Sequence, residues 1–521
     1  MTDYDIIAIG SGHNGLVAAA YCALAGKKVL VLERNDWFGG GVVTRELTRP
    51  GFRHDQHSMS HIFIQGNPML VNDELGLKSR YGLRYLFPDV PMMSVWEDGA
   101  TLALHRDSEK SAQEIAKFSA KDAESFRAMS RQAAAWLPMI QATLYTPPMP
   151  VGASNAMLDQ SPEGREIWRI MQMSSHDVLC ELFEDDRVRM HFARVAGENL
   201  VSPDEKATGI GVYVFLGFLE AYGFGVAVGG SGSLTNALIA CIEDHGGAVR
   251  ANAEVREVLA EGGRATGVVL DDGSRIMAGD AVIGAIHPHL LPEIVPAVPE
   301  GVARAAKRTQ ISEAGCITVH AALDAPLRFR DGSGVRAVMT ELMPDSYETL
   351  RRAFDDLRYG GFVRTPLIGF GSLSTFDPSR VPEGKATLHA WDYVPYRRSD
   401  GAAWDDTKFA YAERMIARMA EFLPNIRAVM LDHHVDSPVD MERTSPSFLR
   451  GDLHGIATTT YQSGAHRPTP ELGQYRVPGV DRLYLVGPFQ HPGGGVFGAG
   501  RATAQVLLDD LGVDFDKVRL S

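Results

Sequence analysis

Residues 5–33 read DIIAIGSGHNGLVAAAYCALAGKKVLVLE, and this segment is the clearest indication of the fold. The apolar run Asp5–Ile9 predicts a strand that is covered on both faces. Gly10–Gly15 ends that strand, and Leu16–Ala25 predicts a helix rich in small residues. Val29–Leu32 predicts a second strand. This order of strand, glycine turn, helix and strand indicates a Rossmann-type parallel sheet and an α/β fold.

The glycine turn, GSGHNG, has the G-x-G-x-x-G spacing of a dinucleotide site. Gly10 permits the tight turn, Gly12 leaves room for a pyrophosphate against the backbone, and Gly15 allows close packing of helix and strand. The helix that follows presents free N–H groups and its positive end to the phosphates. We expect His13 and Asn14, which open this helix, to lie beside the cofactor.

Glu33 ends the second strand and stands 18 residues after Gly15. A carboxylate at this place accepts hydrogen bonds from ribose hydroxyls and repels a 2′-phosphate, which argues against NADP. The turn and the carboxylate together predict an adenine dinucleotide. They do not choose between FAD and NAD.

Three further glycine segments carry a resemblance. They are Gly39–Gly41, Gly229–Leu234 (GGSGSL) followed by Ala253–Val255, and Gly487–Gly498 (GPFQHPGGGVFG). Together with the first turn they resemble the flavoprotein amine oxidase superfamily. The His-Pro-Gly-Gly-Gly of residues 491–495 is more similar to the branch of phytoene desaturases and of pyridine nucleotide-disulfide oxidoreductase domain-containing protein 2.

The resemblance implies FAD, and no residue has the context of a covalent flavin attachment, so we expect FAD to be bound non-covalently. It implies that the second glycine stretch runs beside the pyrophosphate and flavin and that the Val255 backbone contacts the adenine. The residues that we add on this ground to the cofactor site are Arg34, Gly40, Gly41, Val255, Gly487, Gly494, Gly495 and Val496.

The predicted architecture is a Rossmann-type FAD-binding domain with an inserted, partly helical substrate domain of α+β type. We assign residues 1–70, 226–300 and 451–521 to the first domain, and residues 71–225 and 301–450 to the substrate-binding region. Long helical patterns at Ala112–Trp136 and Ile167–Val195 mark the inserted part. Residues 300–450 mix strands and helices without a clear motif.

The resemblance implies a dehydrogenase or desaturase that moves hydride from a carbon of a largely apolar small molecule to flavin N5. The alternatives are an amine or alcohol oxidase that uses O2 and a redox-neutral, flavin-dependent isomerase. A non-catalytic binding protein of the same fold is disfavoured by the intact glycine turn and Glu33. A helix predicted at Arg501–Leu511 follows the last glycines, and its positive end could stabilise reduced flavin.

The candidate catalytic residues are His57, His61 and His491. A neutral imidazole in the flavin pocket can accept a proton during oxidation of the substrate. Structural roles for these three rings are about as well supported as catalytic ones. A metal site that includes His54 lacks a completing carboxylate set, so we predict no metal. The aromatic residues of 213–222 recur at helical spacing and line a pocket or fill a core.

Composition narrows the function classes further. The 521 residues carry a formal charge of −14, which disfavours binding to nucleic acid. The four cysteines form no C-x-x-C pair, which argues against disulfide chemistry and suits the cytoplasm. The sequence starts without a signal-peptide pattern and has no apolar run near the roughly 20 residues that span a bilayer. The sequence leaves peripheral contact with a membrane open. It also leaves open whether the electron acceptor is O2 or a quinone.

Overall fold

The computed structural model describes residues 3–198 and 200–520, and these residues form two seven-stranded sheets. The first sheet has the strand order β10-β11-β12-β1-β2-β9, with β18 paired to β12. Its strands are β1 (Tyr4–Ile9), β2 (Val29–Leu32), β9 (Ala248–Arg250), β10 (Val255–Glu261), β11 (Arg264–Leu270), β12 (Arg275–Gly284) and β18 (Leu483–Leu485). The pairs of β1 with β2 and β12, of β2 with β9, and of β12 with β18 are parallel.

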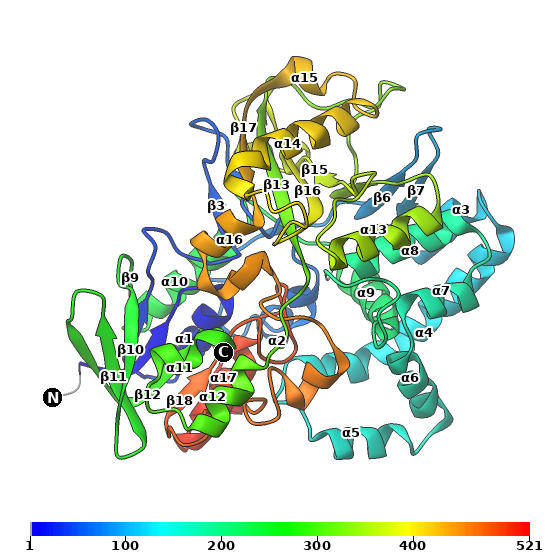
Figure 1. Ribbon diagram of the computed structural model, residues 1–521. Coiled ribbons are helices and arrows are strands. Elements are labelled where there is room, and N and C mark those ends of the chain that lie inside the picture. The colour runs from blue at the N-terminus through cyan, green and yellow to red at the C-terminus, as the bar shows by residue number, and fades with distance from the viewer. Residues whose placement is uncertain (1–2, 199, 521) are drawn as a thin grey trace.

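The β1 strand is buried on both faces, as its apolar run predicts. Ile6 and Ala8 pack with residues of α1 (His13–Leu24), α10 (Gly232–Asp244) and α17 (Gly500–Asp510), which form one core. Ile7 belongs to a second core on the opposite face. The predicted Rossmann-type α/β arrangement is therefore present, and it occupies the lower left of Figure 1.

The second sheet runs in the order β17-β13-β16-β15-β14-β6-β7 and lies at the top of Figure 1. Its strands are β6 (Met92–Val95), β7 (Thr101–Leu104), β13 (Ala314–Leu323), β14 (Met339–Leu342), β15 (Gly369–Gly371), β16 (Ala386–Pro395) and β17 (Met430–Asp436). One face packs on α14 (Trp404–Ala420) through Ile317, Val319 and Ala321. The opposite face of β13 and β16 is turned toward the cavity described below.

The inserted helices lie to the right in Figure 1, and their boundaries correct two sequence expectations. The pattern expected as one helix at Ala112–Trp136 is broken at residues 117–119, where Ser119 caps the second helix by accepting from the Asp122 amide. The pattern at Ile167–Val195 is three helices, because Ser174 and Asp185 act as N-caps. Side-chain oxygens satisfy helix amides at these breaks, which apolar periodicity does not reveal.

The remaining elements are short or lie between the sheets. The helices are α2 (Pro68–Val71), α3 (Ser108–Ala116), α4 (Ala120–Leu144), α5 (Val151–Leu158), α6 (Pro162–Gln172), α7 (Ser175–Leu182), α8 (Asp186–Gly197), α9 (Gly209–Tyr222), α11 (Leu291–Ile294), α12 (Glu300–Lys307), α13 (Tyr347–Arg358), α15 (Ile426–Val429) and α16 (Pro438–Thr444). Two-residue strands pair β3 (Thr44–Arg45) with β4 (His54–Asp55), and β5 (Tyr85–Leu86) with β8 (Val226–Ala227). Within the described residues, no helix has both the length and the apolar character needed to cross a membrane.

The strands of the first sheet all fall in the segments assigned to the FAD-binding domain, and those of the second fall in the segments assigned to the substrate-binding region. Three separate stretches of chain thus complete one sheet. The division into two domains itself stays a prediction.

The C-terminal helix α17 packs directly on α1 at a glycine. A Cβ atom placed on Gly500 would lie 1.9 Å from the Asn14 carbonyl oxygen and 2.8 Å from the Ala18 amide nitrogen. Only a residue without a side chain permits this approach. The contact holds the chain that precedes α17 beside the turn that precedes α1.

We expect Gly500→Ala to lower the free energy of unfolding by about 1–3 kcal/mol, the usual cost of overpacking. The matched control is Gly301→Ala on α12, where a Cβ would meet no atom within 4 Å. That change should leave stability the same or raise it by up to about 1 kcal/mol, because alanine favours helix. Urea unfolding of both variants measures the difference, and equal midpoints would contradict the assigned contact.

Candidate active site

The first glycine turn has the geometry that its sequence predicts. Gly10 has a φ of +87°, which favours glycine, and a Cβ on Gly15 would lie 2.7 Å from the Gly10 carbonyl oxygen. A Cβ on Gly12 would meet no atom within 4 Å. The turn is therefore tight where the strand and helix meet and open at Gly12, where a pyrophosphate requires room.

Glu33 is fixed at the end of β2 by three hydrogen bonds. Its Oε2 accepts from the Ser11 amide at 3.0 Å and from the Ser11 hydroxyl at 2.6 Å, and its Oε1 accepts from the Asn35 amide at 2.9 Å. The Ser11 hydroxyl also accepts from the Gly39 amide at 3.2 Å. Sequence reasoning left Ser11 out, although a hydroxyl between the first two glycines is the signal for such a link.

One cavity of about 810 Å³ connects the first turn with the C-terminal glycines. All of the residues predicted to hold the cofactor line it: Gly10, Gly12, His13, Asn14, Gly15, Glu33, Arg34, Gly40, Gly41, Val255, Gly487, Gly494, Gly495 and Val496. Segments nearly the whole length of the chain apart thus converge on one space. Their contacts with a cofactor stay predictions.

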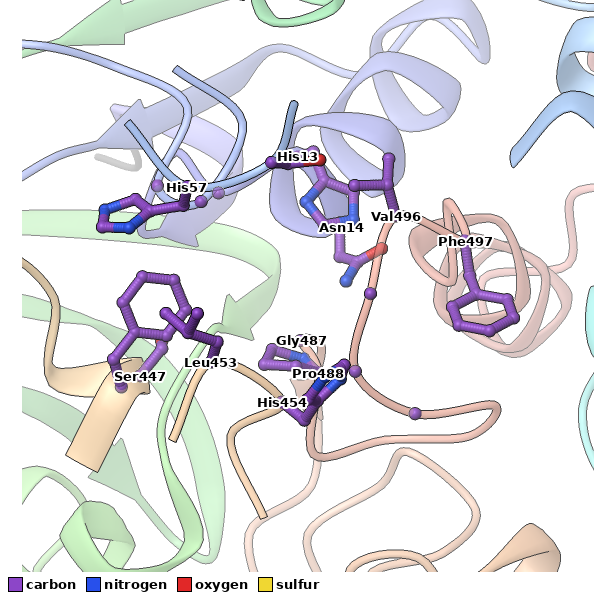
Figure 2. A pocket seen from close by; sticks show the side chains of 18 of the residues that line it. His13, Asn14, His57, Ser447, Leu453, His454, Gly487, Pro488, Val496 and Phe497 are labelled. Carbon is purple, nitrogen blue, oxygen red and sulfur yellow. The ribbon is translucent and has the colours of Figure 1, made fainter. Parts of the chain in front are cut away.

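Figure 2 shows this convergence from close by. His13 and Asn14 enter from the start of α1, and Val496 lies beside them on the C-terminal segment. His454 lies next to Gly487 and Pro488 on the opposite side of the space. A Cβ on Gly494 would lie 2.4 Å from the His454 Cα, so the segment before residue 460 supports the glycine tail. Sequence reasoning did not assign His454 to the site.

Polar groups aimed into the cavity fit a polar, planar cofactor. The His13 ring hydrogen-bonds the Gly495 backbone, and burial together with the nearby His61 lowers the pKa of His13 to about 3, so the ring is neutral. His13 Nε2 and Asn14 Oδ1 are buried and have no hydrogen-bond partner among the described residues. Buried polar atoms normally have partners. A flavin carries several donors and acceptors of the kind that these atoms require.

A buried cation lies beside the C-terminal glycines. Arg467 donates from Nη2 to the Pro488 carbonyl at 2.8 Å and to the Ile456 carbonyl at 3.3 Å. A Cβ on Gly493 would lie 3.5 Å from the Arg467 guanidinium. Burial lowers the pKa of Arg467 to about 10 against the opposing effect of the Asp452 charge, so the guanidinium is still charged at pH 7. Sequence reasoning missed it because the glycine motif is 20 residues further along the chain.

The other half of the cavity is apolar. It is lined from α8, α9 and the second sheet by Val195, Leu200, Ile210, Val214, Phe215, Phe224, Met92, Met339 and Trp391, among others. Of the aromatic residues noted in the sequence, Phe215 lines the cavity, whereas Tyr213 and Phe218 are buried in the core. Apolar walls with few polar groups are typical of a pocket for a hydrophobic small molecule.

Glu198 is the carboxylate within this apolar half. Its Oε1 accepts from the Tyr393 hydroxyl at 2.6 Å and lies 3.2 Å from Arg194, which also donates to Glu341 at 3.0 Å. Burial opposes the charge on Arg194, but Glu341, Tyr393 and Glu198 hold the pKa of Arg194 well above its ordinary value. Burial raises the pKa of Glu341 to about 8, so at pH 7 Glu341 is protonated and Arg194 balances the one charged carboxylate, Glu198, which lines the cavity.

The three predicted catalytic histidines lie in different surroundings. His57 lines the cavity, and neither of its buried ring nitrogens has a partner among the described residues. His61 Nδ1 lies 2.8 Å from the Tyr85 hydroxyl, and His491 Nε2 lies 2.9 Å from the Thr143 carbonyl oxygen. His61 and His491 are not among the residues that line the cavity. No metal-binding group of three or more His, Cys, Asp or Glu side chains occurs among the described residues.

The comparisons with known proteins agree with this geometry. A limonene dehydrogenase polypeptide of Castellaniella defragrans is 27% identical to this chain, over 98% of this chain and 95% of that protein. Pyridine nucleotide-disulfide oxidoreductase domain-containing protein 2 of Mus musculus is 28% identical, over 98% of this chain and 94% of that protein. Lycopene-forming phytoene desaturase of Pseudescherichia vulneris is 25% identical, over 97% of this chain and 99% of that protein. The predicted resemblance is confirmed.

A solved structure with the same fold is cyclohexylamine oxidase of Brevibacterium oxydans, with a TM-score of 0.61 and 17% identity over 98% of this chain and 100% of that chain. The predicted fold class is confirmed. The family of flavin-containing amine oxidoreductases matches residues 15–508. That span includes Gly15, Glu33, Arg467 and the C-terminal glycines of the cavity. The chain therefore belongs to the flavin-containing amine oxidoreductases, a family of enzymes.

Proposed function

We propose that this enzyme is an FAD-dependent dehydrogenase that oxidises a carbon of a largely apolar small molecule. The main observation that supports this proposal is one cavity that has a dinucleotide turn at one end and apolar walls at the other. FAD bound there without a covalent link would supply the acceptor for the hydride. Gly12 and Glu33 hold its adenosine diphosphate part, and the apolar walls orient the substrate and exclude water.

The charges along the cavity suit this chemistry. Arg467, buried beside the C-terminal glycines, stabilises negative charge at that end of the site. At the apolar end, His57 is the neutral group that accepts the proton lost by the substrate. Burial lowers the pKa of His57 to about 4, so the ring has a free nitrogen at pH 7. The names of limonene dehydrogenase and phytoene desaturase, two relatives of this chain, support an apolar substrate.

A second candidate function is the oxidation of amines, and Glu198 is the observation that favours it. The Glu198 carboxylate lines the apolar half of the cavity, where a substrate ammonium group would gain a favourable interaction with its charge. An apolar substrate requires no such charge. The two functions therefore differ in the substrate that reduces the flavin.

We expect an apolar compound and no amine to reduce the flavin. The experiment mixes the holoenzyme anaerobically with limonene, phytoene, cyclohexylamine and putrescine in separate runs and follows loss of the visible flavin absorbance. Reduction by an amine alone, with KM raised by Glu198→Gln, would replace the proposal with amine oxidation. The rates of oxygen uptake and of quinone reduction, compared with the same substrate, then identify the electron acceptor.

We expect Gly12→Val to weaken FAD binding about tenfold or more, since overpacking costs about 1–3 kcal/mol and about 1.4 kcal/mol is a factor of ten. The new side chain occupies open space, so the apoprotein should unfold at the same urea concentration as the wild type. The matched control is Gly152→Val on α5, which also points into open space. Flavin released by acid precipitation gives the content and shows whether it is FAD. Full FAD content in Gly12→Val would contradict the site.

We expect His57→Ala to slow anaerobic flavin reduction by about 100-fold, the lower range for loss of a general base. Its flavin content should not change. His105→Ala, a change before α3 and outside the cavity, serves as the control and should react like the wild type. A normal rate in His57→Ala would assign this ring a structural role.

A further inference from the structure

Three histidines stand side by side across the second sheet. His320 on β13 pairs in register with His389 on β16 and with His434 on β17. The ring centroids of His320 and His389 are 4.4 Å apart, and those of His320 and His434 are 6.4 Å apart. Residues directly opposite in neighbouring strands share one face of a sheet. We call this row, His389–His320–His434, the imidazole row.

The imidazole row runs from the cavity to the surface. His389 lines the cavity, together with Thr318 and Trp391 on the same face of the sheet. At the other end, the His434 side chain is 36% exposed, and its Nε2 lies 2.9 Å from the Asp436 carboxylate. His320 lies between the two and is 0% exposed. The row therefore crosses a region that solvent does not reach.

The buried members of the row carry polar atoms that the fold alone does not require. Neither ring nitrogen of His320, nor Nδ1 of His389, has a hydrogen-bond partner among the described residues. Each unpaired buried group costs about 1–3 kcal/mol, whereas valine or isoleucine would suit a buried strand position. The polar rings must therefore serve a purpose other than stability.

We propose that the imidazole row conducts the proton of each turnover from the cavity to the surface. The inference rests on the proposed dehydrogenation. There the substrate loses two electrons and one hydrogen as hydride to the oxidised flavin, and a second hydrogen as a proton to His57. The proton then binds one nitrogen of His389, and the proton on the other nitrogen moves on to His320 and to His434.

His320 is hydrogen-bonded to neither neighbour at rest, so each transfer requires a small rotation of a ring or a water between two rings. No net charge then stays in the cavity wall. When an acceptor removes the two electrons from the flavin, the hydrogen that arrived as hydride leaves as a second proton, and it takes the same row to the surface.

Imidazole suits this task because one ring nitrogen accepts while the other donates. Burial, and then the rings of His389, His54, His434 and His57, lower the pKa of His320 well below its ordinary value, so it passes a proton on instead of retaining it. The other charges near the row are the buried Asp55–Arg380 ion pair beside His54 and Asp436 at the outer end. Asp436 is itself buried and stabilises positive charge on the His434 ring, whose exposed part releases the proton to solvent.

The test follows proton release without a substrate. Reduced holoenzyme is mixed anaerobically with ferricyanide, two equivalents of which remove the two electrons and free the proton held on the reduced flavin. A pH indicator dye reports the arrival of this proton in solution. In the wild type, the dye should respond in step with the flavin absorbance. In His320→Phe, flavin oxidation should be unchanged, and proton release should slow by about 100-fold.

His191→Phe is the matched control, because His191 is also buried and also has one unpartnered nitrogen but lies outside the row. It should release the proton in step with flavin oxidation. His434→Leu blocks the exposed end with little demand on packing, and it should show the same delay as His320→Phe. Synchronous release in both row variants would overturn the proposal. Since the assay requires only bound flavin, this result is distinct from failure of the substrate panel.

A second measurement needs no flavin. In ¹⁵N-histidine-labelled apoprotein, a conducting His320 should exchange between its two neutral tautomers and give averaged nitrogen shifts. One fixed tautomer for His320, like that expected for the Ser94-bonded His191, would overturn the proposal.

Discussion

The contact of Gly500 with the backbone of α1 is the constraint on which the site depends. Because a Cβ at Gly500 would lie 1.9 Å from the Asn14 carbonyl oxygen, the two helices meet backbone to backbone. The Gly487–Val496 segment that leads into α17 is thereby held against the Gly10–Gly15 turn that leads into α1. Two segments from opposite ends of the chain become two walls of one cavity, and neither forms a cofactor site alone.

The cavity changes character along its length, and this change gives the enzyme its chemistry. Near β1 and β2 it offers backbone amides, open space at Gly12 and the carboxylate of Glu33. Near α9 and the second sheet it offers apolar walls, in which Glu198 and the face of β13 and β16 are the polar exceptions. Buried charge is costly unless it is balanced or put to use. The polar groups in this apolar half are therefore the residues to which we assign selection of the substrate and handling of its proton.

Much of the fold and the cofactor site could be predicted from local patterns. The strand at Val29–Leu32 has the predicted bounds, and the glycines predicted for the cofactor site all line the cavity. A glycine turn or a buried strand consists of consecutive residues, so its signal is complete in the sequence. The helical insert was predicted less well, because caps such as Ser119 and Ser174 interrupt an apolar period that continues across them. Strands were expected among residues 300–450, but their arrangement in one sheet with β6 and β7 was not predicted.

Local patterns along the chain were enough to predict the dinucleotide turn, its ribose carboxylate and the family to which the chain belongs. Only the tertiary structure placed Arg467 beside the glycine tail, Glu198 in the apolar wall and His320 between His389 and His434. The reason is physical. Turn chemistry depends on neighbours along the chain, whereas these groups meet their partners on other strands, helices and loops, and strand register and packing decide which partners they meet.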